Sequence, residues 1–232
     1  MTFLNLNTLP YAPLRHEVVA TALRMNAAGI NQGKSGNVSA RALPDMESTS
    51  PSPFLITPTG IDYHATQPEQ IVLMNMDGTH EGDTLPSSEW RFHRDIYAAR
   101  PEVGAIVHTH SVFATALACQ QRAIPAFHYM VAVAGGNDIR CAPYATFGTQ
   151  ALSDNALGAL TGRHACLLAQ HGMIACGPDL AKALALAVEV ESLAKMYWHA
   201  LQLGEPPCLD DAEMQIVLEK FKSYGQQPDS HK

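Results

Sequence analysis

The sequence has no excess of basic residues, no apolar stretch long enough to cross a membrane and no Cys-x-x-Cys motif. Its formal net charge of −7 argues against nucleic acid or an anionic membrane surface as a partner. Residues 1–10 lack the charged and long apolar regions of a signal peptide. The five cysteines stand mostly in apolar surroundings, which predicts buried free thiols in a reducing cytoplasm.

The chain of 232 residues is 47% hydrophobic and has no internal repeat or dividing linker, which predicts one globular domain over residues 1–232. Apolar periodicity and turn residues predict helices and strands that alternate irregularly, with hairpins among them. This order favours an α/β fold in which helices cover a mixed or mostly antiparallel sheet. The expected helices are 12–28, 90–99, 112–119, 149–160, 180–203 and 211–224, and the expected strands are 54–57, 71–74, 103–110, 139–144, 166–170 and 174–176.

Two histidines, His108 and His110, follow the apolar run 103–107. In a strand, side chains alternate between faces, so these two imidazoles project to the same side. Two imidazoles on a rigid element suit the first half of a transition-metal site. The alternative is that one caps the strand and the other is a core histidine, and this short motif alone leaves both readings open. A third histidine, His171, follows the expected strand 166–170.

Three polar segments combine glycines with hydroxyl or amide side chains. Residues 31–39 suit an anion, but they do not fit the phosphate-loop pattern, and an ordinary loop is the favoured interpretation. The turn 57–60 offers a hydroxyl and a bare backbone amide. Ser87, Ser88 and Glu89 begin an expected helix, where capping and dipole compensation are their usual roles and an anion site is the alternative.

Five motifs occur in one order: Gly36-Asn37-Val38-Ser39, Thr57-Pro58-Thr59-Gly60, Ser87-Ser88-Glu89, His108-Thr109-His110 and His171-Gly172. Together they resemble the zinc-dependent class II aldolase/adducin family. The resemblance extends from the first expected helix to Tyr224, and segments 85–93, 124–147 and 217–225 are most similar to members that cleave L-fuculose 1-phosphate. It implies a three-layer αβα fold with a central mixed, largely antiparallel sheet.

The resemblance also implies a metal centre. It makes His108, His110 and His171 ligands of Zn²⁺, and three neutral imidazoles leave positions open for substrate. Glu89 corresponds to the family's catalytic acid/base, which also occupies the zinc when substrate is absent. The metal stabilises the enediolate of a retro-aldol cleavage, so no Schiff-base lysine is needed, and Lys34 lies in the phosphate loop instead.

The remaining implied roles concern the substrate and the assembly. The residues matching the family's phosphate contacts are Gly36, Asn37, Thr59, Gly60, Ser87 and Ser88, and several such uncharged donors must converge on a dianion. Tyr129 matches a catalytic tyrosine that reaches into the neighbouring subunit's site and protonates the aldehyde oxygen, with bulk packing as its alternative role. This implies a homotetramer with sites at subunit interfaces. Tyr224 matches a tyrosine that shapes the aldehyde pocket.

The implied activity is reversible cleavage of L-fuculose 1-phosphate, or a closely related ketose 1-phosphate, to dihydroxyacetone phosphate and a short aldehyde such as L-lactaldehyde. One alternative is another enzyme on the same fold: a phosphopentulose 4-epimerase, or a dehydratase or aldolase of methylthioribulose 1-phosphate. The epimerases carry aspartate where Glu89 stands, which counts against them. The other alternative is an adducin-like scaffold, and the intact three-histidine set counts against it.

Two departures from the family pattern stand out. The Pro/Ser-rich segment 43–53, expected as an exposed excursion between strands, is longer than in the fuculose enzyme and could alter a contact at the rim of the site. Thr109 separates the two histidines but lies on the opposite face of the strand, so we expect no change in zinc binding. The aldehyde stays open, because one methylene or hydroxyl in a small pocket discriminates by only ~1–3 kcal/mol.

Overall fold

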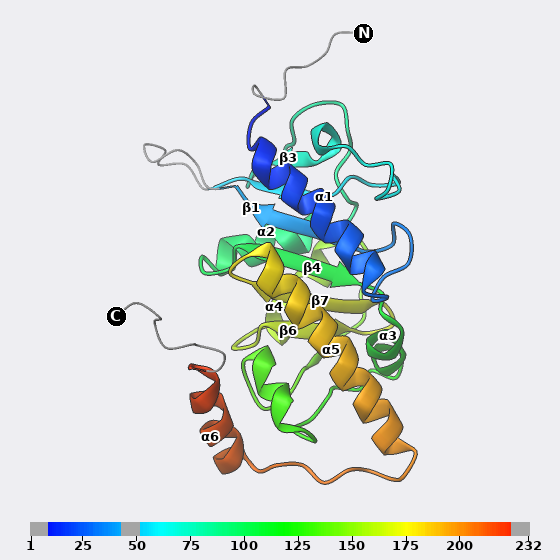
Figure 1. The fold of residues 1–232 in the computed structure, drawn as a ribbon, viewed down its shortest axis with the longest axis vertical. Coiled ribbons are helices and arrows are strands. Elements are labelled where there is room, and N and C mark those ends of the chain that lie inside the picture. Colours follow the sequence, from blue (N-terminus) through cyan, green and yellow to red (C-terminus); the bar gives the residue numbers. More distant parts are fainter. Residues whose placement is uncertain (1–8, 43–51, 224–232) are drawn as a thin grey trace, which may run out of the picture.

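The computed structural model describes residues 9–42 and 52–223 (Figure 1). Within these ranges one sheet runs in the order β3-β2-β1-β4-β7-β6-β5. Every neighbouring pair is antiparallel except β5 and β6, which are parallel, so the predicted mixed, largely antiparallel sheet is confirmed. The strands are β1 (Asn37–Arg41), β2 (Phe54–Ile56), β3 (Val72–Met74), β4 (Ala105–Thr109), β5 (Cys141–Ala142), β6 (Ala165–Leu168) and β7 (Gly172–Gly177).

Helices cover both faces of this sheet, which confirms the three-layer arrangement. The first face carries α1 (Ala12–Ala27), α3 (Val112–Cys119) and α5 (Leu180–Leu201), and Figure 1 shows α1 and α5 crossing it. The second face carries α2 (Trp90–Ala99) and α4 (Gln150–Ala159). Outside the layers, α6 (Asp211–Phe221) packs on the 3₁₀ helix η3 (Tyr129–Ala134), and a second 3₁₀ turn, η2, spans Pro68–Gln70.

The central strands are apolar on both sides because helices cover both faces. Along β4, Val107 joins the core beneath α1 and α5, whereas Ile106 joins the core beneath α2 and α4. Side chains alternate along a strand, so His108 shares the face of Ile106. Its ring meets Phe92 of α2 edge-on, with 5.4 Å between the ring centroids. The strand therefore aims its histidine at the start of the α2 layer.

The structure places a strand where we predicted a loop. Residues 31–36 do form the loop, but β1 starts at Asn37 and pairs with both β2 and β4. Residues 37–41 do alternate between polar and apolar side chains, but the alternation is short and directly continues the Gly- and Ser-containing segment 31–36, so the loop interpretation included it. The expected strand 139–144 is reduced to β5. Segment 43–53 connects β1 with β2 as expected, although residues 43–51 lie outside the described ranges.

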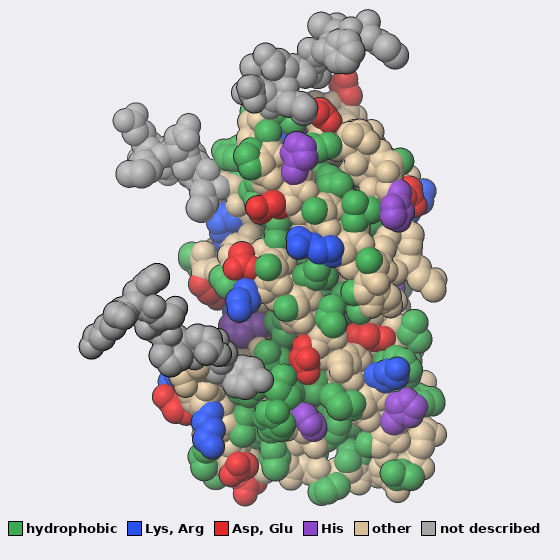
Figure 2. All heavy atoms as spheres, in the orientation of Figure 1, with side chains coloured by type: hydrophobic (Ala, Val, Ile, Leu, Met, Phe, Trp, Pro, Cys, Tyr) green, Lys and Arg blue, Asp and Glu red, His purple; other side chains and the backbone are tan. Residues whose placement is uncertain are grey.

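Cysteine burial agrees with the prediction only in part. The five thiols are unpaired. Cys166 and Cys176 are buried in the sheet, but Cys119 and Cys208 are exposed, because one ends α3 and the other lies in the irregular segment before α6. Within the described ranges no helix is long and apolar enough to cross a membrane. Figure 2 shows basic and acidic side chains interspersed on one face of the molecule.

Candidate active site

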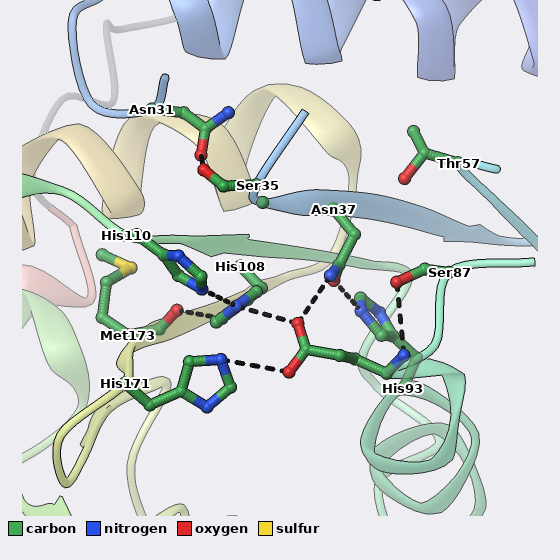
Figure 3. Close-up of polar contacts among 12 residues, drawn as sticks. Asn31, Ser35, Asn37, Thr57, Ser87, His93, His108, His110, His171 and Met173 are labelled. Atoms are coloured by element: carbon green, nitrogen blue, oxygen red, sulfur yellow. Dashed lines mark hydrogen bonds and ion pairs between the residues drawn. The ribbon is translucent and has the colours of Figure 1, made fainter. Parts of the chain in front are cut away.

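Three histidines meet at one end of the neighbouring central strands β4 and β7 (Figure 3). His108 lies in β4, His110 follows its last residue, and His171 ends the turn between β6 and β7. Their ring centroids are 4.9 to 5.0 Å apart in all three pairs. The ligand atoms of these imidazoles and of the Glu89 carboxylate all lie within 4.8 Å of one another. The four residues expected to bind the metal are therefore brought together.

Two glycines allow the segments around β4 to approach this closely. A Cβ atom on Gly172 would lie 2.4 Å from the Thr109 carbonyl oxygen and 2.9 Å from Cδ2 of His110. A Cβ atom on Gly36 would lie 2.4 Å from the carbonyl oxygen of His108. Any side chain at either position would push its segment away from β4, so both glycines are required by contact rather than by backbone conformation.

The hydrogen-bond pattern leaves lone pairs facing one another. Nδ1 of His108 lies 2.9 Å from the carbonyl oxygen of Met173, so Nδ1 carries the proton and Nε2 carries a lone pair. This Nε2 atom is 3.1 Å from Nε2 of His110 and 3.1 Å from Oε2 of Glu89. Oε1 of Glu89 is buried without a hydrogen bond, 3.1 Å from Nε2 of His171. Converging lone pairs of this kind fit a metal cation.

The surroundings of Glu89 favour its ionised form. Burial raises the pKa of Glu89, but the charge and hydrogen bonds that His108 and His171 offer when protonated outweigh burial and hold the pKa well below its ordinary value. Burial, together with the neighbouring His108 and His171, lowers the pKa of His110 to about 4. At neutral pH the site thus offers a carboxylate and a neutral imidazole, the forms in which these groups bind metals.

The contacts at the start of α2 show which of Ser87, Ser88 and Glu89 support the helix and which face the histidines. Glu89 stands at the N-cap position, yet its side chain makes no hydrogen bond to the helix amides. Oγ of Ser87 accepts a hydrogen bond from the Glu89 backbone N–H at 3.3 Å, so Ser87 does support the helix start. Ser88 is exposed. The carboxylate of Glu89 is turned away from the helix and toward the histidines.

The segments predicted to bind phosphate lie next to one another. Nζ of Lys34 donates to the Gly60 carbonyl oxygen at 2.8 Å, which joins the first loop to the turn 57–60. The backbone N–H of Ser87 donates to the carbonyl oxygen of Thr57 at 3.0 Å, which joins that turn to the start of α2. Of the predicted contacts, Gly36, Asn37 and Ser87 are buried, and Thr59, Gly60 and Ser88 are exposed.

Asn37, one of the predicted phosphate contacts, also contacts the carboxylate beside the histidines. It is opposite His108 in the pairing of β1 with β4, and it is only 2% exposed. Its Nδ2 atom donates to Oε2 of Glu89 at 3.0 Å. Behind Gly36, the buried hydroxyl of Tyr63 donates to the Gly36 carbonyl oxygen. Direct contacts thus hold together the carboxylate of Glu89 and the backbone that is predicted to bind an anion.

A cavity of about 270 Å³ opens at the histidines. Its walls include two exposed aromatic side chains, Tyr144 and Phe147, from the loop between β5 and α4. The sequence patterns did not mark these two residues as functional, although aromatic residues in a Pro- and Gly-containing loop would have justified attention. The other lining residues are Ser35, Ser88, Glu89, His110, Ala145, Gln170 and His171.

Neither predicted site tyrosine is among the described residues at the histidines. Tyr129 starts η3 and is 48% exposed, and it is not among the residues that line the histidine cavity. It lines a separate cavity beside α6, together with Phe127 and Val217. Tyr224 lies outside the described residues. Within a single chain, the described part of the site is therefore made without either tyrosine.

The fold and this constellation define the class of protein. Residues 16–198 match the family described as Class II Aldolase and Adducin N-terminal domain. The chain belongs to this family, as its motifs predicted, and its similarity to named aldolases makes it a class II aldolase rather than a scaffold.

Individual relatives are similar over almost the whole chain. The 5-methylthioribulose-1-phosphate/5-deoxyribulose-1-phosphate aldolase of Rhodospirillum rubrum is 54% identical over 212 residues, which cover 91% of this chain and 92% of that protein. The L-fuculose phosphate aldolase of Escherichia coli is 50% identical over 213 residues, covering 91% and 95%. A solved structure of an L-fuculose 1-phosphate aldolase superposes with a TM-score of 0.84 at 41% identity, covering 90% and 96%.

Proposed function

We propose that this chain is a zinc-dependent aldolase that reversibly cleaves L-fuculose 1-phosphate, or a closely related ketose 1-phosphate, to dihydroxyacetone phosphate and a short aldehyde. The observation that carries the proposal is the convergence of His108, His110, His171 and Glu89 beside clustered uncharged hydrogen-bond donors. Three imidazoles with a carboxylate suit zinc, and they leave coordination positions for substrate once the carboxylate moves away.

The reaction breaks the bond between C3 and C4 of the sugar. The C4 hydroxyl loses its proton to become the aldehyde, and the bonding electrons remain on the three-carbon fragment until C3 is protonated. Zinc held by the three histidines would supply a Lewis acid for the negative charge on that fragment. Phosphate would be held by Gly36, Asn37, Thr59, Gly60, Ser87 and Ser88, at the loops and helix start that suit an anion.

Two residues would move the protons. Glu89 is assigned to C3, because its Oε1 atom is buried beside the histidines and makes no hydrogen bond of its own. Tyr129 is assigned to the C4 oxygen, where it takes the proton in cleavage and returns it in synthesis. Tyr224 is assigned to the aldehyde pocket on the family resemblance alone.

A second candidate substrate has its own support. The relative at 54% identity is named for 5-methylthioribulose 1-phosphate and 5-deoxyribulose 1-phosphate. Cleavage of these sugars between C3 and C4 gives the same dihydroxyacetone phosphate, with (methylthio)acetaldehyde or acetaldehyde in place of lactaldehyde. The exposed rings of Tyr144 and Phe147 give the cavity an apolar wall that suits a methyl or methylthio group.

A panel of ketose 1-phosphates tests the proposal. We expect L-fuculose 1-phosphate, 5-deoxyribulose 1-phosphate and 5-methylthioribulose 1-phosphate all to release dihydroxyacetone phosphate, because their first three carbons are alike. Their kcat/KM values should differ by about 10- to 200-fold, the range that small changes in a pocket produce. Release is measured with a coupled reductase. Isomerisation or water loss without release would contradict the proposed reaction, and release from none of the sugars would contradict the substrate class.

We also propose that Tyr129 completes the site of a neighbouring subunit in a cyclic homotetramer. In support, its ring is half-exposed and lines no part of the histidine cavity in its own chain. Figure 2 shows hydrophobic side chains gathered between α6 and α5, where Figure 1 places η3. An apolar surface of this kind suits an interface, and a heterologous interface that closes on itself forms a ring.

Mixed tetramers test this assignment. Subunits carrying Glu89→Gln and subunits carrying Tyr129→Phe should regain activity when unfolded, mixed and reassembled, because some sites then contain both native residues. Turnover by the hybrids is compared with that of the same two proteins mixed without reassembly, and hybrid composition is verified by native mass spectrometry. Verified hybrids that show no gain would place Tyr129 in its own chain's site or outside any site.

We place the enzyme in the cytoplasm. Five unpaired thiols are stable in a reducing compartment, whereas secreted proteins usually pair theirs. The proposed substrates are phosphate dianions, which need a transporter to leave the compartment that makes them.

A further inference from the structure

A buried chain of four hydrogen bonds ends at Glu89. The hydroxyl of Tyr97 is 2.8 Å from Oγ of Ser39, which is 2.6 Å from Nδ1 of His93. On the other side of the imidazole, Nε2 of His93 is 2.5 Å from Oδ1 of Asn37, whose Nδ2 is 3.0 Å from Oε2 of Glu89. Each of the five residues is at most 5% exposed. Ser39 belongs to the first of the five motifs and His93 to segment 85–93, but no role followed from the sequence for Ser39, His93 or Tyr97.

The direction of each hydrogen bond follows from the carboxylate end. The ionised carboxylate of Glu89 can only accept, so Asn37 must present its N–H group to it. The amide oxygen of Asn37 then faces His93, and an amide oxygen also only accepts. Nε2 of His93 must therefore carry a proton. Figure 3 shows the side chains of Asn37 and His93 pointing toward each other, to the right of His108, His110 and His171.

The other end of the chain requires the same directions. Burial, with repulsion from His108, lowers the pKa of His93 to about 3, so the ring is neutral and its Nδ1 atom is an acceptor. The only hydrogen of the Ser39 hydroxyl must then point to Nδ1. Burial raises the pKa of Tyr97, so its phenol keeps a proton and donates it to Ser39. All four hydrogen bonds point toward Glu89.

We propose that His93 is a positioning residue for the reaction, fixing the Asn37 amide so that its N–H group holds Oε2 of Glu89. Ser39 and Tyr97 keep the imidazole in the protonation state that this requires. With Oε2 occupied, Oε1 is the oxygen that exchanges the proton with substrate. The inference rests on the proposed function, because it assigns a consequence to the role of Glu89 in turnover.

The physical consequence of losing His93 is an amide anchored at one end only. The carboxylate of Glu89 still selects the N–H group of Asn37, but the amide oxygen loses the donor that fixes it 2.5 Å from Nε2 of His93. The Asn37 side chain can then rotate away from Oε2, and the carboxylate of Glu89 loses the contact that orients it. The alternative role for His93 is only to satisfy buried polar groups, and its loss would then lower stability without a specific effect on turnover.

Spectroscopy on the intact protein tests the hydrogen-bond directions independently of any substrate. The side-chain nitrogens of ¹⁵N-histidine-labelled, deuterated protein report which ring nitrogen carries the proton. The signal that disappears in His93→Gln identifies His93. We expect a protonated Nε2 and a bare Nδ1, and a proton on Nδ1 would overturn the proposal whatever the enzyme cleaves.

Two replacements of His93 test the role in turnover. His93→Phe removes both nitrogens but keeps a ring, and we expect kcat to fall about 10- to 100-fold, as for other outer-shell groups of metal sites. His93→Gln keeps an amide donor near the position of Nε2, so it should recover most of that loss. If His93 only supported the structure, the kcat values of the two variants would follow their melting temperatures. A kcat that is recovered in His93→Gln but not in His93→Phe, beyond any difference in melting temperature, therefore indicates a positioning role.

Ser153→Ala is the matched control. Ser153 is fully buried and donates to Asp95 at 2.6 Å between α4 and α2, so its loss removes a buried hydrogen bond from the same layer. We expect a lower melting temperature and an unchanged kcat. Equal losses of kcat in His93→Phe, His93→Gln and Ser153→Ala would overturn the positioning role. Wild-type protein that cleaves no ketose 1-phosphate would refute the proposed function, and the spectroscopic result would still decide the hydrogen-bond directions.

Discussion

Alanine in place of His110 or His171 is expected to abolish both metal binding and aldolase turnover. Each histidine supplies one of the three imidazoles proposed to bind zinc. Without it, only two imidazoles and Glu89 remain, and Glu89 is also needed for proton transfer, so too few ligands are left to retain zinc during catalysis. Wild-type protein should contain about one zinc ion per chain, as a site of this ligand set requires, and the variants close to none. Metal content is measured by elemental analysis of the purified proteins, and turnover by release of dihydroxyacetone phosphate.

The control for this experiment is His64→Ala, because His64 is exposed and is not one of the four residues that could hold the metal. It should keep its metal and its turnover. Removing the metal from wild-type protein with a chelator should give the same inactive state, and Zn²⁺ should restore it. Full metal occupancy in the His110 and His171 variants would contradict the ligand assignment, even if both variants were inactive.

The grouping of His108, His110, His171 and Glu89 could be predicted from the sequence only in part. A buried apolar strand running into His-x-His projects both rings to one face whatever else the fold does. His171 and Glu89 have no such periodicity, and only their order among five motifs connected them with the strand. The distances that bring the four together come from sheet pairing and from the contacts at Gly36 and Gly172, and neither can be read from spacing along the chain.

The fold was predictable in its layers but not in all its strands. Amphipathic helices and apolar runs identify α1, α2, α5 and the central strands, because their burial follows the periodicity. β1 was missed because its polar positions, Asn37 and Ser39, are buried against partners that belong to α2. Polar side chains on the buried face of a strand do not indicate burial in the sequence, because the partners that satisfy them lie on another element, in this case α2 and the residue before it. The role of His93 could not be recognised for the same reason, because its partners Asn37 and Ser39 lie on β1.

Glu89→Gln is expected to keep both metal and phosphate binding and to lose about 10²- to 10⁴-fold in kcat, the usual contribution of a positioned proton-transfer group. The side chain makes no capping hydrogen bond to α2, so the substitution should cost the helix little. Its amide is nearly the same size as the carboxylate, and its oxygen can still accept the hydrogen bond from Asn37. The lost property is the exchangeable proton at the position of Oε1.

Three measurements separate this loss from its alternatives. Zinc content and the affinity for inorganic phosphate should match wild type, which would show that the metal-binding and anion-binding residues are intact. Glu69→Gln is the control for a helix-dipole role, because Glu69 is an exposed acid in the first turn of η2, and it should leave kcat unchanged. Near-normal turnover by Glu89→Gln would mean that the carboxylate serves only the helix start, and the proton at C3 would then need another source.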